Sequence, residues 1–202
     1  MTSFRALTRL CRSVGAAVMV AGLTCVPLSA QSAPMSPSTS SPKAGQMAPD
    51  FTLVAIEGSS VRLTTELARG PVVLVVLRGW PGYDCPFCTR QFAEYMTRAA
   101  DIEATGAHVL FVYPGPPDGL KEHAEAFIKK RSLPAGYRLL LDPDYTFTQA
   151  YGLRWDAPNE TVYPSTFVID TRGTIAFART SHSHGDRVLV SDVLTALAQL
   201  GR

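Results

Sequence analysis

Apolar runs of strand length mark the chain after residue 45. The run VVLVVL (72–77) is uninterrupted and β-branched, and it is too short for a helix, so it predicts a strand buried on both faces. AHVLFVY (107–113) predicts a second buried strand, and YRLLLD (137–142) predicts a short third strand. These runs indicate a sheet whose centre is covered on both sides.

Two further segments have the pattern of paired strands joined by a tight turn. FTLVAIEGSSVRLTTEL (51–67) predicts two short strands around residues 57–59. STFVID (165–170) and TIAFAR (174–179) flank the hairpin signal Thr-Arg-Gly. The sequence therefore predicts an N-terminal β-hairpin and a second hairpin near the C-terminus.

Apolar residues at helical spacing lie between these strands. We predict helices at 89–105, 118–132 and 144–151, and an amphipathic helix from about 186 to 200. This order of elements predicts an α/β fold in which a central mixed sheet is flanked by helices on both faces, with the N-terminal hairpin as an extension. Sites in such sheets form where the central strands end.

The first 30 residues have the order of a secretory signal peptide. Basic residues are followed by an uncharged, mostly apolar stretch at 14–28 and then by small residues, so we predict cleavage after Ala30. The alternatives are an uncleaved anchor, although a bilayer crossing needs about 20 apolar residues, and a lipoprotein attached at Cys25, although Gly22 and Thr24 fit that cleavage pattern poorly. We expect the protein to be exported, to the periplasm or as a secreted protein, and to contact a membrane only through this segment before cleavage.

The remaining chain divides into two parts. Residues 31–44 are rich in Ser and Pro and predict a flexible linker, and residues 45–202 predict one domain. The signal segment carries three arginines and no acidic residue, so the rest of the chain has 16 basic and 17 acidic residues, a net charge of about −1. With no basic stripe, nucleic-acid binding is not expected.

Cleavage would leave two cysteines, Cys85 and Cys88, directly after the 72–77 strand. At the start of a helix, side chains three residues apart lie on one face, so the two sulfurs can reach bonding distance. Cys85 would stand at the helix start with Pro86 in the first turn, where unpaired N–H groups and the helix dipole favour a thiolate. Cys88 would be the more buried thiol. The spacing predicts a reversible dithiol–disulfide couple.

A structural disulfide and a metal site are the alternatives. A cross-link between such close residues constrains the unfolded chain little. Zinc takes four ligands, and the mature chain has no second cysteine pair. A copper(I) site made of both thiolates and either His182 or His184 stays open, and with it a copper-binding or chaperone module. For the redox couple itself we expect no metal and no cofactor beyond the Cys85–Cys88 disulfide.

Four stretches, in this order, resemble the thioredoxin-like superfamily and most of all its peroxiredoxin-like branch, which is related to alkyl hydroperoxide reductases and thiol-specific antioxidant proteins. They are APDFTL (48–53), VVLVVLRGWPGYDCPFCTRQ (72–91), LLLDPDYTFTQAYGL (139–153) and YPSTFVIDTRGTIAFAR (163–179). The resemblance covers about residues 45–200. It implies a thioredoxin-like fold, an oxidoreductase with a redox-active centre, and antioxidant activity or a role in cell redox homeostasis.

The resemblance leaves the order of attack open. Thioredoxins attack with the first cysteine of the pair, here Cys85, whereas Cys88 stands at the attacking position of peroxiredoxins and Cys85 replaces their threonine. Our first interpretation is an exported thiol–disulfide oxidoreductase in which Cys85 attacks and Cys88 resolves. The alternative is a peroxide reductase in which Cys88 is peroxidatic and Cys85 resolves. The partner is accordingly a protein disulfide or dithiol, or a small peroxide.

The resemblance also implies substrate-binding residues. Pro164 matches the cis-proline that thioredoxins place opposite their disulfide, where the backbone would hold a substrate as an added strand beside Tyr163. Trp80 and Tyr83 are candidates for the wall of a groove. The peroxide-polarising arginine of peroxiredoxins is missing at this position, and the candidate substitutes elsewhere in the chain are Arg154 and Arg179.

Overall fold

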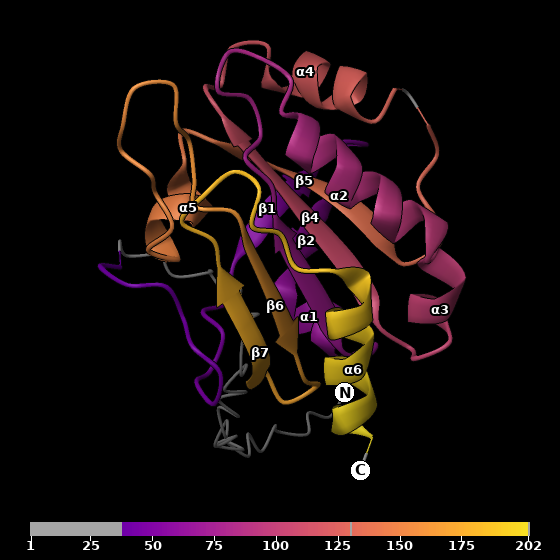
Figure 1. The fold of residues 1–202 in the computed structure, drawn as a ribbon. Helices are drawn as coiled ribbons and strands as arrows, with labels where there is room; N and C mark the ends of the chain where they lie inside the picture. Colours follow the sequence, from indigo (N-terminus) through magenta and orange to yellow (C-terminus); the bar gives the residue numbers. More distant parts are fainter. Residues whose placement is uncertain (1–37, 130, 202) are drawn as a thin grey trace, which may run out of the picture. The chain divides into compact units, whose positions relative to one another are not determined.

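The computed structural model describes residues 38–129 and 131–201 (Figure 1). The predicted signal peptide and residues 31–37 of the predicted linker lie outside this range. The elements, in chain order, are β1 (Thr52–Ala55), β2 (Ser60–Arg62), α1 (Leu63–Leu67), β3 (Val72–Val76), α2 (Pro86–Thr97), α3 (Ala99–Glu103), β4 (His108–Gly115), α4 (Leu120–Phe127), β5 (Tyr137–Pro143), α5 (Thr146–Ala150), β6 (Ser165–Ile169), β7 (Ile175–Thr180) and α6 (Val190–Leu200). Within the described residues, no helix has the length and apolarity that a bilayer crossing requires.

The strands form one mixed sheet in the order β2-β1-β5-β4-β3-β6-β7. Strands β3, β4 and β5 run parallel, while β1 and β6 run antiparallel to β5 and β3. Helices α2, α3, α4 and α6 cover one face, and α1 and α5 cover the other (Figure 1). The predicted mixed sheet with helices on both faces and an N-terminal hairpin, β1–β2, is confirmed.

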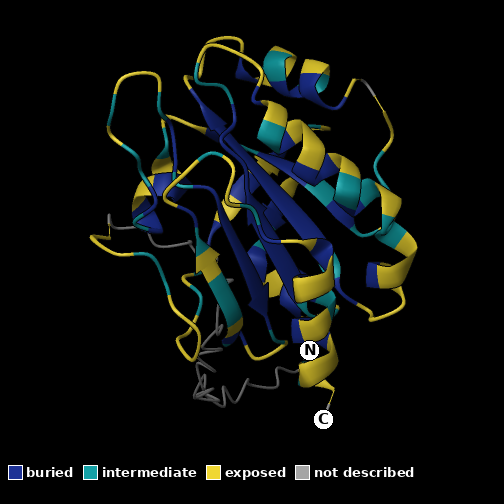
Figure 2. Ribbon diagram, viewed as in Figure 1, coloured by how far each residue is buried: buried dark blue, intermediate teal, exposed yellow. Residues whose placement is uncertain are grey.

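Strand β3 lies at the centre of both cores. Val73 and Val75 pack with residues of α2, α4 and α6, whereas Val72, Leu74 and Val76 pack with residues of α1 and α5. All five are buried, because successive side chains of a strand point to opposite faces and both faces are covered (Figure 2). The uninterrupted apolar run at 72–77 follows from this position in the sheet.

Several predicted boundaries differ from the structure; the helix predicted at 118–132, for example, is α4, Leu120–Phe127. The second strand of the first hairpin is short, and α1 follows at once, with Asp50 Oδ1 accepting from the Thr64 N–H at 3.1 Å. The predicted helix 89–105 is interrupted at Arg98, between α2 and α3. The last helix begins at Val190, whose N–H donates to Glu94 Oε1 at 2.9 Å, and the preceding residues form a loop.

The described residues before Gly45 lie against the domain. The Ser38 N–H donates to Gln149 O at 3.0 Å, and Ser41 Oγ lies 2.8 Å from Thr180 Oγ1. The Gly45 N–H donates to Ile175 O at 2.8 Å. Among the described residues, those from Ser38 onward already contact the domain, although their Ser/Pro composition assigned them to a linker.

Candidate active site

The cysteine pair lies at the junction between β3 and α2. Cys85 is the N-cap of α2, Pro86 occupies the first turn, and Cys85 Sγ accepts from the Cys88 N–H at 3.4 Å. This arrangement is the one that the spacing predicted, and both cysteines are free thiols. Cys88 is the more buried thiol, as expected, but the difference in exposure is small: Cys85 is itself only 2% exposed and Cys88 1%. A loop before α6 covers both, which no local pattern around the cysteines reveals.

The two thiols have opposite pKa shifts. A hydrogen bond from the Cys88 side chain is the largest cause that lowers the pKa of Cys85 to about 5, and the backbone N–H of Cys88, Arg187 and Arg78 add to it against the effect of burial. The pKa of Cys88 is raised well above its ordinary value, first by its hydrogen bond to Cys85 and then by burial. These directions favour the thiolate at Cys85 and the protonated thiol at Cys88.

Arg78 connects the two cysteines to the ion pair that its guanidinium forms with Glu160. Its backbone N–H donates to Cys88 Sγ at 3.3 Å. Its guanidinium, which is 1% exposed, lies 2.8 Å from Glu160 Oε2 and donates to Asn159 O and Tyr83 Oη, each at 2.7 Å. Gly79 turns the chain sharply here at φ +65°, and an added Cβ would lie 1.8 Å from Pro114 O.

Arg187 lies beside both sulfurs. Its Nη2 is 3.9 Å from Cys85 Sγ and 3.7 Å from Cys88 Sγ. Its Nη1 and Gln91 Oε1 are buried without a hydrogen-bond partner among the described residues, and both residues line a small recess together with Pro164 and Ser181. An unpartnered donor and an unpartnered acceptor thus belong to residues that line one recess, and one of these residues, Arg187, lies beside both sulfurs.

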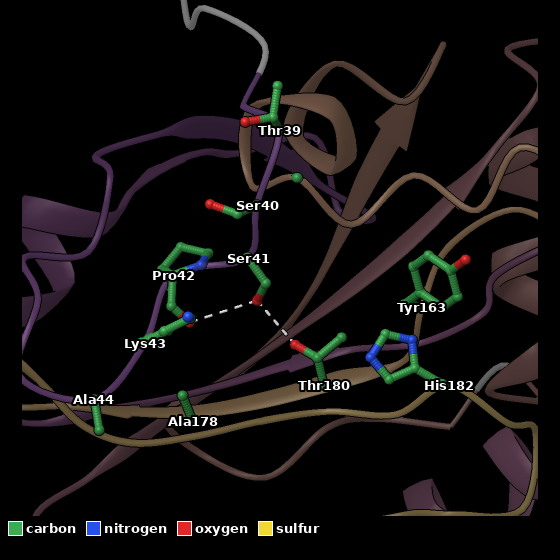
Figure 3. A pocket seen from close by; sticks show the side chains of 11 residues that line it. Thr39, Ser40, Ser41, Pro42, Lys43, Ala44, Tyr163, Ala178, Thr180 and His182 are labelled. Carbon is green, nitrogen blue, oxygen red and sulfur yellow. Dashed lines mark hydrogen bonds between the residues drawn. The ribbon is translucent and has the colours of Figure 1, made fainter.

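The residues predicted to bind substrate do not converge on the sulfurs. The expectation of a cis-proline is wrong, because the described residues contain no cis peptide bond and Pro164 is trans. Pro164 is buried at the recess, but its neighbour Tyr163 lines a separate pocket of about 450 Å³. In that pocket, Tyr163 and His182 lie opposite Ser41 and Pro42 (Figure 3).

Trp80 and Tyr83 are engaged with other side chains. Trp80 stacks on His123 of α4, with ring centroids 3.6 Å apart and planes at 10°. Tyr83 is exposed, accepts a hydrogen bond from Arg78 and lies under its guanidinium, with 5.2 Å between the guanidinium carbon and the ring centroid. Their role in binding substrate stays a prediction.

Neither arginine proposed as a substitute hydrogen-bonds the sulfurs. Arg154 donates to the backbone carbonyls of Trp155, Glu160 and Thr161. Arg179 pairs with Asp186 at 2.9 Å. Among the residues that the structure describes, no three His, Cys, Asp or Glu side chains gather as a metal site would require, so the copper alternative gains no support.

Sequence reasoning missed the groups that surround the thiols. Arg78 follows the central strand directly, and a charged residue immediately after a buried strand was the available signal. Gln91 lies one turn beyond Cys88 on the same helix, so its spacing also placed it near the pair. No local pattern singles out Arg187 or Glu160, because they reach the site from distant loops.

Comparisons with known proteins agree with this geometry. The AhpC/TSA family profile matches residues 44–178. A Mycobacterium tuberculosis protein named "Putative peroxiredoxin" is 30% identical over 140 residues, covering 67% of this chain and 83% of that protein. The chloroplast peroxiredoxin Q of Gentiana triflora is 30% identical over 131 residues, covering 65% of this chain and 56% of that protein.

Solved structures support the same assignment. The crystal structure of the peroxidoxin BcpB from M. tuberculosis superposes with a TM-score of 0.62 at 25% identity, covering 78% of this chain and 97% of that one. M. tuberculosis AhpC, at 16% identity and a TM-score of 0.63, shares the fold and covers 80% of this chain and 94% of its own. The family match over residues 44–178, the relatives at 30% identity and the shared thioredoxin-like fold show that the chain belongs to the AhpC/TSA family of peroxiredoxin-like, thiol-dependent oxidoreductases.

Proposed function

We propose that the protein is an exported two-cysteine thiol peroxidase in which Cys85 attacks and Cys88 resolves. The observation that carries this proposal is the position of Cys85 as the N-cap of α2, where its Sγ accepts from the Cys88 N–H and lies 3.9 Å from Arg187 Nη2. In these surroundings the pKa of Cys85 is lowered to about 5 and that of Cys88 is raised. This order of attack differs from the peroxidase that alignment with peroxiredoxins suggested, because a nucleophile must be ionised and Cys88 holds its proton.

The reaction then has three balanced steps. The Cys85 thiolate attacks the terminal oxygen of a hydroperoxide and becomes a sulfenic acid, and the O–O bond breaks to release an alkoxide or hydroxide that takes up a proton. The Cys88 thiol attacks the sulfenic sulfur, forming the Cys85–Cys88 disulfide and water. A dithiol partner reduces this disulfide and is itself oxidised to a disulfide.

Small oxidants suit the surroundings of the sulfurs. The Arg187 guanidinium is within 4 Å of both sulfurs, where it favours the thiolate and the negative charge that develops on the departing oxygen. In the adjoining recess, Gln91 Oε1 is an acceptor for the proton of a hydroperoxide, and Arg187 Nη1 is a donor to its oxygen. Both groups lack other partners among the described residues, so a peroxide would satisfy them.

Thiol–disulfide exchange is the second candidate function. The N-cap position of Cys85 and its lowered pKa are equally suited to attack on a disulfide sulfur, after which Cys88 would release the substrate. Export rests on the order of basic, apolar and small residues in the first 30 positions. An oxidising compartment would require a dedicated reductant for either activity.

The test compares Cys85→Ser and Cys88→Ser in the reduced protein. Exposed to hydrogen peroxide, Cys88→Ser should accumulate a sulfenic acid on Cys85, detected by mass spectrometry after dimedone trapping, and Cys85→Ser should not form one on Cys88. Rapid sulfenic acid formation on Cys88 would refute the assigned order. Wild-type turnover of hydrogen peroxide and of a model disulfide, measured side by side, decides between the two candidates. The mass of the protein recovered from the periplasm or medium tests cleavage after Ala30.

A further inference from the structure

A short loop before α6 covers the cysteine pair. It runs between two buried anchors: Ser181, whose N–H donates to Pro164 O at 2.8 Å, and Val188 before α6. We call residues 182–187 the covering loop. Besides Arg187, it brings Gly185 against the ring of Phe87, where an added Cβ would lie 3.3 Å from a ring carbon.

The covering loop is tied to the buried ion pair behind the cysteines. His184 Nε2 lies 2.8 Å from Glu160 Oε1, while the other carboxylate oxygen of Glu160 holds Arg78 at 2.8 Å. Since Arg78 donates its backbone N–H to Cys88 Sγ, Glu160 connects the loop to a residue that contacts the redox centre. His184 is the residue of the loop that makes this connection.

Aromatic contacts add to this attachment. The His184 ring lies 5.4 Å from Trp155, and the His182 ring lies 5.0 Å from Tyr163. Trp155 and Tyr163 stack on each other at 4.8 Å, so both histidines of the SHSHG segment dock on one aromatic pair. These contacts give the two histidines a structural role, which is to hold the covering loop against Trp155 and Tyr163.

Access to the sulfurs requires this loop to move. Cys85 and Cys88 are almost completely buried, and the recess beside Arg187 has no room for a water-sized molecule in this conformation. A hydroperoxide needs a small displacement of the loop to reach Cys85. The thiol of a partner protein, which must contact a sulfur of the Cys85–Cys88 disulfide, needs a much larger one.

We propose that the covering loop is a size-selective gate over Cys85 and that His184 is the positioning residue that latches it to Glu160. This inference rests on the proposed function, because it takes Cys85 and Cys88 as the redox centre. Latched, it admits small hydroperoxides and excludes bulky disulfides and thiols. Released, it admits the dithiol of the reducing partner.

The experiment measures how strongly access depends on the size of the reagent. The reduced full-length protein is reacted with iodoacetamide, which is small, and with 5,5′-dithiobis(2-nitrobenzoic acid), which is bulky, and the two rate constants for Cys85 are expressed as a ratio. His184→Ala removes the latch. His184→Gln makes the same change of charge but keeps an N–H donor for Glu160, and Glu125→Gln changes an exposed carboxylate of α4 that pairs only loosely with Lys121 at 3.9 Å.

We expect His184→Ala to raise the bulky-to-small ratio roughly tenfold or more, since a hydrogen bond to a charged group changes an equilibrium constant by about that factor. His184→Gln should stay within about threefold of wild type, and Glu125→Gln should leave the ratio unchanged. Amide hydrogen exchange in residues 182–187 should accelerate in His184→Ala alone, at an unchanged melting temperature.

A ratio for His184→Ala within twofold of wild type would overturn the gate, as would equal effects of the Ala and Gln variants. Both reagents report access and not turnover, so the gate is tested separately from peroxidase activity. If the ratio responds as expected but the wild type reduces no peroxide, the proposed function fails while the gate stands.

Discussion

The hydrogen bond between the two thiols predicts different behaviour for two variants that both lack the resolving cysteine. The Cys88 side chain is the largest cause of the lowered pKa of Cys85. Cys88→Ala removes this donor, whereas Cys88→Ser replaces it with a hydroxyl donor of similar position. Both variants keep the backbone N–H at position 88. Cys88→Ala also removes the sulfur that accepts from the Arg78 N–H and lies beside Arg187, whereas the serine oxygen of Cys88→Ser can still accept there.

The magnitude follows from the chemistry of the bond. A hydrogen bond to a charged group contributes about 1.5–3 kcal/mol, which corresponds to roughly one to two pH units in a titration midpoint. From a wild-type pKa of about 5, Cys85 in Cys88→Ala should therefore titrate at roughly pH 6–7. At pH 6 the thiolate fraction should fall from about 90% in the wild type to about 50% if the new pKa is about 6, and to about 10% if it is about 7.

The assay is thiolate absorbance at 240 nm, followed from pH 3.5 to 9 in the reduced proteins, with Cys85→Ser/Cys88→Ser as the baseline. Cys88→Ser should titrate close to wild type and Cys88→Ala clearly above it. If the two variants titrate together, the thiol–thiolate hydrogen bond does not control the pKa of Cys85. If the wild type titrates like an ordinary thiol, near pH 8.5, the assignment of Cys85 as nucleophile loses its physical basis.

Three further predictions concern stability. The pKa of Cys85 is lower in the folded protein than in the unfolded chain, so its ionisation stabilises the fold fully above about pH 8.5, and this stabilisation is lost as the pH falls toward 5. The free energy of unfolding of the reduced protein should therefore rise by about 1.4 kcal/mol per pH unit across that window. Urea titrations of Cys85→Ser should show no such rise. Gly79→Ala should be severely destabilising, because the added Cβ would overlap Pro114 O. Gly82 also has a positive φ but lies in open space, so Gly82→Ala should cost only about 1 kcal/mol. Equal losses of stability in the two variants on thermal unfolding would contradict this reasoning. Arg78→Met should cost about 3–5 kcal/mol, because it leaves the Glu160 carboxylate without its buried partner. Arg62→Met, which breaks a half-exposed pair with Asp50, should cost about 1 kcal/mol or less in the same denaturant titration.

Local pattern was sufficient where local chemistry decides the structure. An apolar run of strand length at 72–77 has few ways to be buried other than as a central strand, and β3 occupies that position. The spacing of Cys85 and Cys88 around Pro86 likewise places the first cysteine at a helix N-terminus, because a proline is best accommodated in the first turn. Both predictions depend only on residues within a few positions of one another.

Tertiary structure decided which cysteine is ionised and what reaches it. The amino-acid sequence by itself determined the sheet, the start of α2 and the place of the two cysteines on it, since backbone and side-chain sterics act over short distances along the chain. It did not determine the surroundings of the sulfurs, because Arg187 and Glu160 come from loops about 100 and 75 residues away in sequence. Electrostatic interactions and burial depend on distance through space, and only the folded chain brings these charges to the thiols and closes the loop over them.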